Sequence, residues 1–245
     1  MPTELVPIFA SAPESPFADD PVVQLRCDPA ALPEPLRQDF TALSGDFDNL
    51  ADDLWLKSEY VFRQRRFGRF VVDLETGATE PLEDQPFYQS TDVNHYAGGI
   101  ERRFESLEKR TQDNTFLAAL MRSVLALLPA RDRDRATRWE CGVHLMRIIA
   151  RPGQPGFPAP EGMHRDGHAF TALTLMRRTD VDGAVSRFAT PDGAVYRELV
   201  MQEPGDTVVF QDPRCMHDVT PIEVRPGAPV GVRDICGFSV NPVEA

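Results

Sequence analysis

The second half of the chain, from Arg138 onward, is a succession of short β-type runs separated by turn signals such as PDGA and EPGD. The runs read ECGVHLMRIIA, HAFTALTLMRR, AVSRFAT, AVYRELVM, DTVVFQD and RDICGFSV. Short runs rich in β-branched and aromatic residues, punctuated by Gly, Pro and Asp, are typical of antiparallel strands. The sequence therefore predicts a β-sandwich or barrel in this half of the chain.

Helical patterns dominate the first half. Apolar residues recur three or four positions apart in RQDFTALSGDFDNLADDLW and are expected to face a core: Phe40, Leu43, Phe47, Leu50 and Leu54. A second helix is predicted in DNTFLAALMRSVLALLPAR, which Asp113 or Asn114 can cap and Pro129 ends. Between the helices, RRFGRFVVDLETGATEPL predicts a hairpin with its turn at residues 75–77.

Helices that precede the strands, rather than alternate with them, indicate a mainly β fold of the α+β class, with N-terminal helices buttressing one face of the β-core. Residues 1–35 are rich in Pro, Ala and Asp and show neither helical nor strand period, so we expect a partly ordered lead-in. Residues 36–245 are expected to form a single domain, with helical support mainly in 36–135 and the β-core mainly in 139–241.

Composition excludes several classes of partner. The net charge of −12 argues against nucleic acid, because phosphate binding needs clustered Lys and Arg. The start of the chain lacks the pattern of a signal peptide, and no stretch approaches the roughly 18 apolar residues of a membrane span. The four cysteines form no CxxC pair and are expected to be buried single side chains in a reducing compartment. We therefore expect a cytoplasmic protein.

The segment PEGMHRDGHAFTALTL carries the clearest chemical signal. If residues 164–166 begin a strand, His164 and Asp166 point to the same face, since side chains alternate with period two. His217, in VVFQDPRCMHDVTPIEV, can lie beside them if an antiparallel partner brings the two segments together. Two His and one carboxylate on one face of an octahedron suit a non-haem Fe(II) enzyme that uses O₂.

Other histidines compete for this assignment. His168 lies two residues after Asp166 and could replace His164 as a ligand on spacing alone. We favour His164, because Gly167 in HRDG can bend the chain directly after the carboxylate. His95 and His144 are expected to be structural, or to support the metal ligands from outside.

Several segments resemble the bacterial Fe(II)/2-oxoglutarate dioxygenases typified by L-isoleucine 4-hydroxylase. They are PEGMHRDGHAF, DPRCMHDVTPI and VRDICGFSV, preceded by FYQSTDVNHYAGGIERRF and CGVHLMRIIA, and together they cover roughly residues 60–240. The resemblance implies a double-stranded β-helix, or jelly-roll, core of the cupin kind. It also implies that His164, Asp166 and His217 bind Fe(II), and that the chain uses 2-oxoglutarate and O₂ and releases succinate and CO₂.

The resemblance further implies an arginine for the distal carboxylate of 2-oxoglutarate, and Arg233 occupies the matching position. Guanidinium holds a carboxylate with two parallel hydrogen bonds, and Arg233 lies within a β-run 16 residues after His217. Arg225 is the alternative, but Pro and Gly around it indicate a loop. The family pattern of an Asn and paired glycines after the HxD strand is reduced here to RRTDVDGAVS, so the loop 179–184 is expected to alter the border of the substrate pocket.

The resemblance points to a free aliphatic L-amino acid, of isoleucine or leucine type, as a small-molecule substrate hydroxylated at an unactivated C–H. Arg102 or Arg103 could bind its carboxylate, and Gln89 and Asn94 could orient it by hydrogen bonds. A homodimer is left open. Two alternatives remain: a metal-dependent cupin-type enzyme that does not use 2-oxoglutarate, and a catalytically silent jelly-roll domain that binds a small acid.

Overall fold

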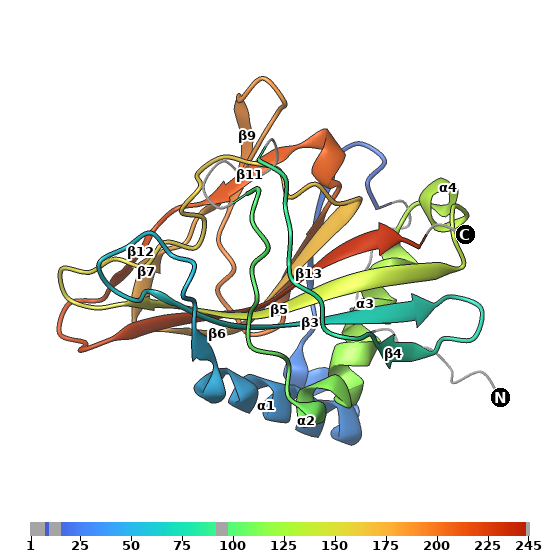
Figure 1. Cartoon of the computed structure of the whole chain (residues 1–245), viewed down its shortest axis with the longest axis horizontal. Coiled ribbons are helices and arrows are strands. Elements are labelled where there is room, and N and C mark those ends of the chain that lie inside the picture. The colour runs from blue at the N-terminus through green and yellow to red at the C-terminus, as the bar shows by residue number, and fades with distance from the viewer. Residues whose placement is uncertain (1–7, 10–15, 92–97, 244–245) are drawn as a thin grey trace.

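An antiparallel sheet of eight strands forms the centre of the computed structural model, which describes residues 8–9, 16–91 and 98–243 (Figure 1). Its strands are, in spatial order, β1 (Val22–Arg26), β10 (Asp206–Phe210), β6 (Phe170–Thr179), β13 (Gly231–Pro242), β5 (Arg138–Ala150), β3 (Arg63–Asp73) and β2 (Ala51–Asp52), with β4 (Thr79–Pro81) paired to β3. The predicted hairpin at residues 75–77 is confirmed by the β3–β4 pair.

Two smaller sheets lie over one face of this main sheet, above it and at its left in Figure 1. The first contains β11 (Met216–Val219), β8 (Ser186–Ala189) and β9 (Val195–Leu199), and the second pairs β12 (Ile222–Val224) with β7 (Val181–Gly183). Ile222 and Val181 pack against Ile148 of the main sheet. The predicted fold class, a mainly β jelly-roll with flanking helices, is confirmed.

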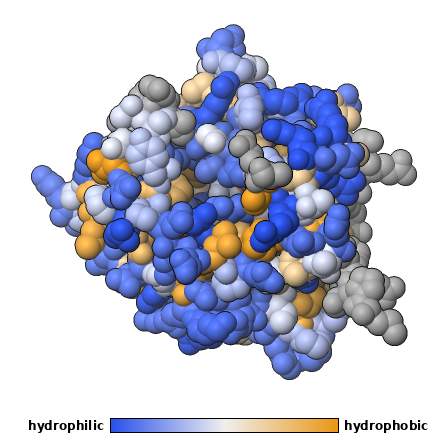
Figure 2. Space-filling model, turned by 45° about the vertical axis from the view of Figure 1, so that its right-hand side comes forward, coloured by the Kyte–Doolittle hydropathy of each residue, from blue (hydrophilic) through white to orange (hydrophobic). Residues whose placement is uncertain are grey.

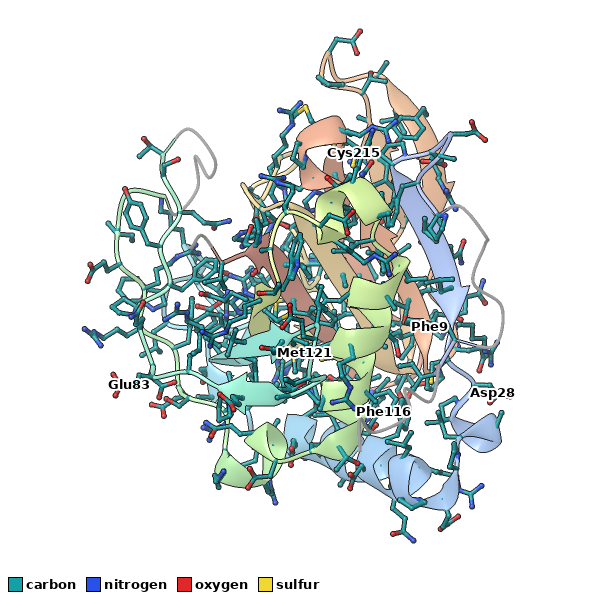
Figure 3. The ribbon with its side chains drawn as sticks, turned by 90° about the vertical axis from the view of Figure 1, so that its right-hand side faces the viewer. Phe9, Asp28, Glu83, Phe116, Met121 and Cys215 are labelled. Atoms are coloured by element: carbon teal, nitrogen blue, oxygen red, sulfur yellow. The ribbon has the colours of Figure 1, made fainter. Side chains whose placement is uncertain are left out.

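Helices cover the opposite face of the main sheet (Figure 1). They are mainly α1 (Glu34–Asp46), α2 (Lys109–Gln112) and α3 (Thr115–Leu127), with the 3-10 turns η1 (Pro29–Ala31) and η2 (Phe47–Asn49). The short helix α4 (Ala130–Arg133) follows α3, and a further 3-10 turn, η3 (Asp212–Arg214), lies between β10 and β11 on the side of the smaller sheets. As predicted, Asn114 caps α3: its side chain accepts the N–H of Leu117. In Figure 3, α3 runs along the sheet, and its Phe116 packs edge-on against Phe40 of α1 with ring centroids 5.0 Å apart.

Side chains alternate between the two faces of the central strands. On β5, Val143 and Leu145 join the core under α1 and α3, whereas His144 and Met146 face the smaller sheets. This alternation follows from the period of two in an extended chain. It divides the molecule into an apolar layer on the helical side and a space lined by mixed side chains on the other.

One expectation about the first 54 residues is wrong. Leu54 is 86 % exposed, because the helix ends at Asp46, a 3-10 turn follows, and the chain then enters β2. Within the expected lead-in of residues 1–35, residues 22–26 form a strand that the sequence pattern did not indicate, and they pair with β10 at the edge of the main sheet. A five-residue edge strand has too few alternations to be recognised locally. The domain boundary at residue 35 stays a prediction.

The four cysteines are buried and free, as predicted: Cys27, Cys141, Cys215 and Cys236. The face shown in Figure 2 is mainly hydrophilic, with small hydrophobic areas between polar side chains. Within the described residues, no helix is both long and apolar enough to cross a membrane.

Candidate functional site

A cavity of about 1040 Å³, counted with its open mouth, lies between the main sheet and the smaller sheets. Alternate residues of β3, β5 and β13 form its floor, and residues of β11 and of the segment 158–168 complete its walls. Apolar side chains and charged groups share this lining.

His164, Asp166 and His217 lie together in this cavity, with their ligand atoms within 4.8 Å of one another. Nε2 of His164 is 3.4 Å from Oδ1 of Asp166, and Nε2 of His217 is 3.5 Å from its Oδ2. An antiparallel bridge joins the backbones of His164 and His217 through two hydrogen bonds of 3.0 and 2.8 Å. The segment 164–166 precedes strand β6 instead of beginning it, but the expected side-by-side arrangement with His217 is present.

Neighbouring groups fix the orientation of these side chains. Nδ1 of His164 lies 2.7 Å from the carbonyl oxygen of Gly162, so it carries the proton and Nε2 faces Asp166. The hydroxyl of Thr171 donates to Oδ2 of Asp166 at 3.2 Å. An imidazole oriented through its other nitrogen is the usual arrangement in metal sites.

Asp212 holds the loop that follows Asp166. Its carboxylate accepts the backbone N–H groups of Asp166 and Gly167 at 2.8 Å each, and that of His168 at 3.3 Å. Gly167 has a φ of +83°, which supports the predicted bend after the carboxylate. No local pattern indicates this role of Asp212, because it depends on a contact between segments 46 residues apart.

The electrostatics favour a carboxylate flanked by imidazoles. Burial opposes ionisation of Asp166, but His217 and His164 outweigh it and hold its pKa well below the usual range. Burial lowers the pKa of His217 to about 4. Burial also opposes a charge on His164, but Asp166 and Glu161 outweigh it and raise its pKa to about 9. A divalent cation bound here would displace the second imidazole proton of His164 and would compensate the negative charge of the buried Asp166 carboxylate.

The other histidines occupy different positions. His168 also lines the cavity, but its Nδ1 lies 3.1 Å from Nδ2 of Asn241 and its ring is outside the three-residue cluster. His144 stacks on Phe67 with ring centroids 4.5 Å apart and lines the cavity. His95 lies outside the described residues.

Arg233 is buried in β13 and lines the same cavity; it is 3 % exposed. Its Nε and Nη2 have no hydrogen-bond partner among the described residues. Burial, together with the nearby Arg178, lowers its pKa to about 9, which leaves it charged at neutral pH. A buried cation without an anion is costly, so Arg233 fits a site for an anionic ligand. Arg225 is exposed and pairs with Asp182 at 3.1 Å.

Gln89 and Arg102 also belong to the cavity wall. Nε2 of Gln89 donates to the carbonyl oxygen of Asp166 at 3.2 Å, and Nη2 of Arg102 donates to Oε1 of Gln89 at 2.7 Å. Arg103, in contrast, is exposed and does not line the cavity. Asn94 lies outside the described residues.

Three charged lining residues are absent from the sequence predictions: Arg63, Arg65 and Glu161. A period-two reading of RQRRF would have placed the two arginines on one face of β3. The expectation for the loop 179–184 is wrong, because none of its residues lines the cavity. Strand β7 lies within that segment and pairs with β12. The segments around Phe87 and Pro158 border the cavity instead.

A family model described as 2OG-Fe dioxygenase matches residues 44–239, which is most of the chain. The chain belongs to this family. The dioxygenase is 24 % identical over 179 residues to L-isoleucine-4-hydroxylase of Bacillus thuringiensis, with 72 % of each chain covered.

Solved structures agree on the fold. The dioxygenase is similar to a bsmA homologue from Methylobium petroleophilum PM1, with a TM-score of 0.75, 28 % identity and 91 % of this chain and 90 % of that chain covered. It is also similar to IDO from Bacillus thuringiensis, with a TM-score of 0.75, 20 % identity and 93 % of both chains covered.

Membership of the family establishes the class of reaction. The protein is an Fe(II)- and 2-oxoglutarate-dependent dioxygenase that uses O₂. The two alternatives, a cupin-type enzyme without 2-oxoglutarate and a silent acid-binding domain, thereby lose their support.

Proposed function

We propose that this dioxygenase hydroxylates an unactivated C–H of a free aliphatic L-amino acid, of isoleucine or leucine type, and releases succinate and CO₂. In this proposal His164, Asp166 and His217 bind the iron. The observation that carries it is the cluster of two imidazoles and one carboxylate in a cavity that also contains a buried arginine without an anion. This donor set suits Fe(II) and leaves coordination positions open.

Arg233 binds the distal carboxylate of 2-oxoglutarate. Two of its nitrogens lack a partner among the described residues, and a planar guanidinium can hold a carboxylate with two parallel hydrogen bonds. Because it is buried in a strand of the main sheet, its position is fixed before the ligand arrives.

The bound iron and 2-oxoglutarate supply the oxidising chemistry, and the chain itself positions the substrate and excludes water. Apolar side chains suited to an aliphatic substrate line the cavity: Met146, Ile148, Leu173, Val219 and Ile235. The relative named L-isoleucine-4-hydroxylase supports an amino acid of this kind. Gln89 and Arg102, which also line the cavity, orient the substrate.

The test is substrate-dependent succinate formation. Purified protein loaded with Fe(II) without air is mixed with 2-oxoglutarate, O₂ and each standard amino acid in turn, and succinate and products heavier by one oxygen atom are measured. We expect an aliphatic amino acid to stimulate succinate formation and to gain the oxygen. If none of the amino acids stimulates it, the proposed substrate is wrong.

A matched pair of variants tests the site in the same assay. Asp166→Ala removes the carboxylate between the two imidazoles and is expected to abolish iron-dependent turnover. Asp182→Ala removes an exposed carboxylate and is expected to leave turnover unchanged. Turnover by the Asp166→Ala variant would contradict the ligand assignment.

A further inference from the structure

A second cationic group, distinct from Arg233, lies in the wall of the cavity. It consists of Arg63, Arg65 and Arg102, which are 7 %, 6 % and 4 % exposed. In the sheet, Arg63 and Arg233 pair with Ile148 from its two sides, so their backbones are about 10 Å apart. The cavity therefore contains two separated sites that can attract an anion.

Asp53 is the acid in contact with this group, and it compensates only part of its charge. Its carboxylate accepts from Nε of Arg63 at 2.8 Å and from Nη1 of Arg65 at 3.4 Å. Arg102 has no salt bridge among the described residues. Three buried guanidinium groups and one buried carboxylate leave an excess of positive charge that an anionic ligand would stabilise.

Arg65 and Arg102 have donors to spare. Apart from Asp53, Arg65 contacts the neutral His144, at 2.9 Å from its Nη2, and Arg102 donates to the amide of Gln89. The Nε atoms of both arginines are buried without a hydrogen-bond partner among the described residues. Buried N–H groups of this kind normally have partners, so their absence points to a ligand.

Aromatic rings hold the two guanidinium groups in place. The Cζ atom of Arg65 lies 3.6 Å from the ring centroid of Phe104, and that of Arg102 lies 4.9 Å from the ring centroid of Phe87. Such contacts are favourable for Arg and restrict how its plane can turn. The two groups are thus positioned before any ligand binds.

Glu161 provides the opposite charge in the same cavity. Apart from Asp166, it is the acid among the described lining residues. Its Oε1 lies 3.3 Å from Nε2 of His164, and its side chain is 16 % exposed. Burial lowers the pKa of Arg102 and the charge of Glu161 partly offsets this, so these two lining side chains are near enough to interact.

We propose that Arg65 and Arg102 bind the carboxylate of the primary substrate, and that Glu161 accepts its ammonium group. This assignment rests on the proposed function and deepens it, because it requires an amino acid with both its carboxylate and its amine free. Amino acid esters and amides and simple acids lack one of the two charges, and peptides do not carry both on one residue, so all of these bind poorly. The apolar side chain of the substrate then lies against the aliphatic part of the cavity wall.

Arg102→Gln is the direct test, with Arg103→Gln as its control, since Arg103 is exposed and next in sequence. We expect Arg102→Gln to raise KM for the stimulating amino acid about 30-fold or more, as loss of a buried charged partner does. KM for 2-oxoglutarate should not change in either variant. An unchanged KM for the amino acid in Arg102→Gln, in an assay where the wild type is stimulated, would overturn the assignment.

Ligand analogues test the need for both charges of the substrate in the wild-type protein. The result then does not depend on whether a variant folds. Binding to the protein loaded with Mn(II) and 2-oxoglutarate without O₂ is measured by calorimetry for L-isoleucine, L-isoleucinamide and 3-methylpentanoic acid. We expect each analogue to bind at least about tenfold more weakly than the amino acid. Equal affinities would overturn the proposal.

Glu161→Gln separates the two charges. It should reduce the preference for L-isoleucine over 3-methylpentanoic acid and retain the preference over L-isoleucinamide. The opposite pattern would show that Glu161 does not face the amine. These outcomes can be told apart from a failure of the proposed function. In that case no amino acid would stimulate succinate formation by the wild-type protein.

Discussion

At the scale of single residues, Asp212 shows how the proposed iron site depends on a side chain outside it. Its carboxylate orders three successive backbone N–H groups, from Asp166 to His168. We expect Asp212→Ala to weaken Fe(II) binding about 10- to 100-fold, because the loop that aims Asp166 would lose its anchor. Anaerobic titration calorimetry measures this, with the exposed Asp192→Ala as control. Equal affinities in the two variants would contradict the role.

Arg233 allows a second prediction at this scale. Arg233→Gln is expected to raise KM for 2-oxoglutarate about 30-fold or more and to leave Fe(II) binding intact, since it removes a buried charged partner away from the metal ligands. Arg225→Gln, at an exposed arginine, is the matched control. If both variants keep the wild-type KM, another group binds the distal carboxylate.

His144 predicts a pH dependence of stability. Burial and the adjacent Arg65 hold its pKa well below its usual value, so the folded protein keeps it neutral. Below about pH 6.5 the unfolded chain takes up a proton there and the folded chain does not, so stability falls as the pH drops.

The measurement is urea unfolding of metal-free protein at neutral pH and at about pH 5. His144→Gln should lose about 1 to 2 kcal/mol less stability over this interval than the wild type. Parallel losses in the two proteins would show that His144 does not titrate on unfolding.

The sequence predicted His164 and Asp166 because HxD carries its own geometry, with two side chains on one face of an extended segment. His217 followed only from the assumption that an antiparallel partner lies beside that segment. The prediction missed Arg63, Arg65 and Glu161 because charged residues are usually solvated. Which of them turn into a cavity depends on the register between β3 and β5, and no local pattern states that register.

At the scale of secondary-structure elements, one ionic network joins the helical layer to the sheet. Nε of Arg147 on β5 donates to Asp234 on β13 at 2.7 Å. Nη2 of the same arginine donates to Asp48 in η2 at 2.8 Å. The side chain of Asp234 is fully buried. We expect Arg147→Ala to lower the free energy of unfolding by about 3 kcal/mol, because it leaves a buried carboxylate with weaker compensation.

The exposed pair of Arg225 and Asp182 is the comparison for this network. Arg225→Ala should cost at most about 1 kcal/mol, since solvent screens that pair. Chemical denaturation of both variants measures the difference. A smaller loss in Arg147→Ala than in Arg225→Ala would contradict the importance of the network.

Elements with strong local signals were predictable, and those defined by distant partners were not. The helix α3 has a cap, an apolar stripe and a terminating proline, and β3–β4 has a clear turn. The strand β1 forms by pairing with β10, about 180 residues away along the chain. Leu54 is exposed because the chain before it pairs as β2 with β3 and no longer continues the helix.

At the scale of the whole molecule, the jelly-roll brings His164, Asp166 and His217, one buried arginine and a second cationic group into one cavity between sheets. The helices on the other face stabilise the main sheet without reaching that space. The two arginine sites lie on strands of the same sheet, so one rigid element sets the distance between the ligands they are proposed to bind.

A crystal structure of the protein with Mn(II) and 2-oxoglutarate, prepared without O₂, tests this arrangement most directly. We expect the metal on Nε2 of His164, a carboxylate oxygen of Asp166 and Nε2 of His217, with the distal carboxylate of 2-oxoglutarate on Arg233 and the site at Arg65 and Arg102 left for substrate. A metal bound elsewhere, or 2-oxoglutarate held by Arg65 and Arg102 in place of Arg233, would contradict it.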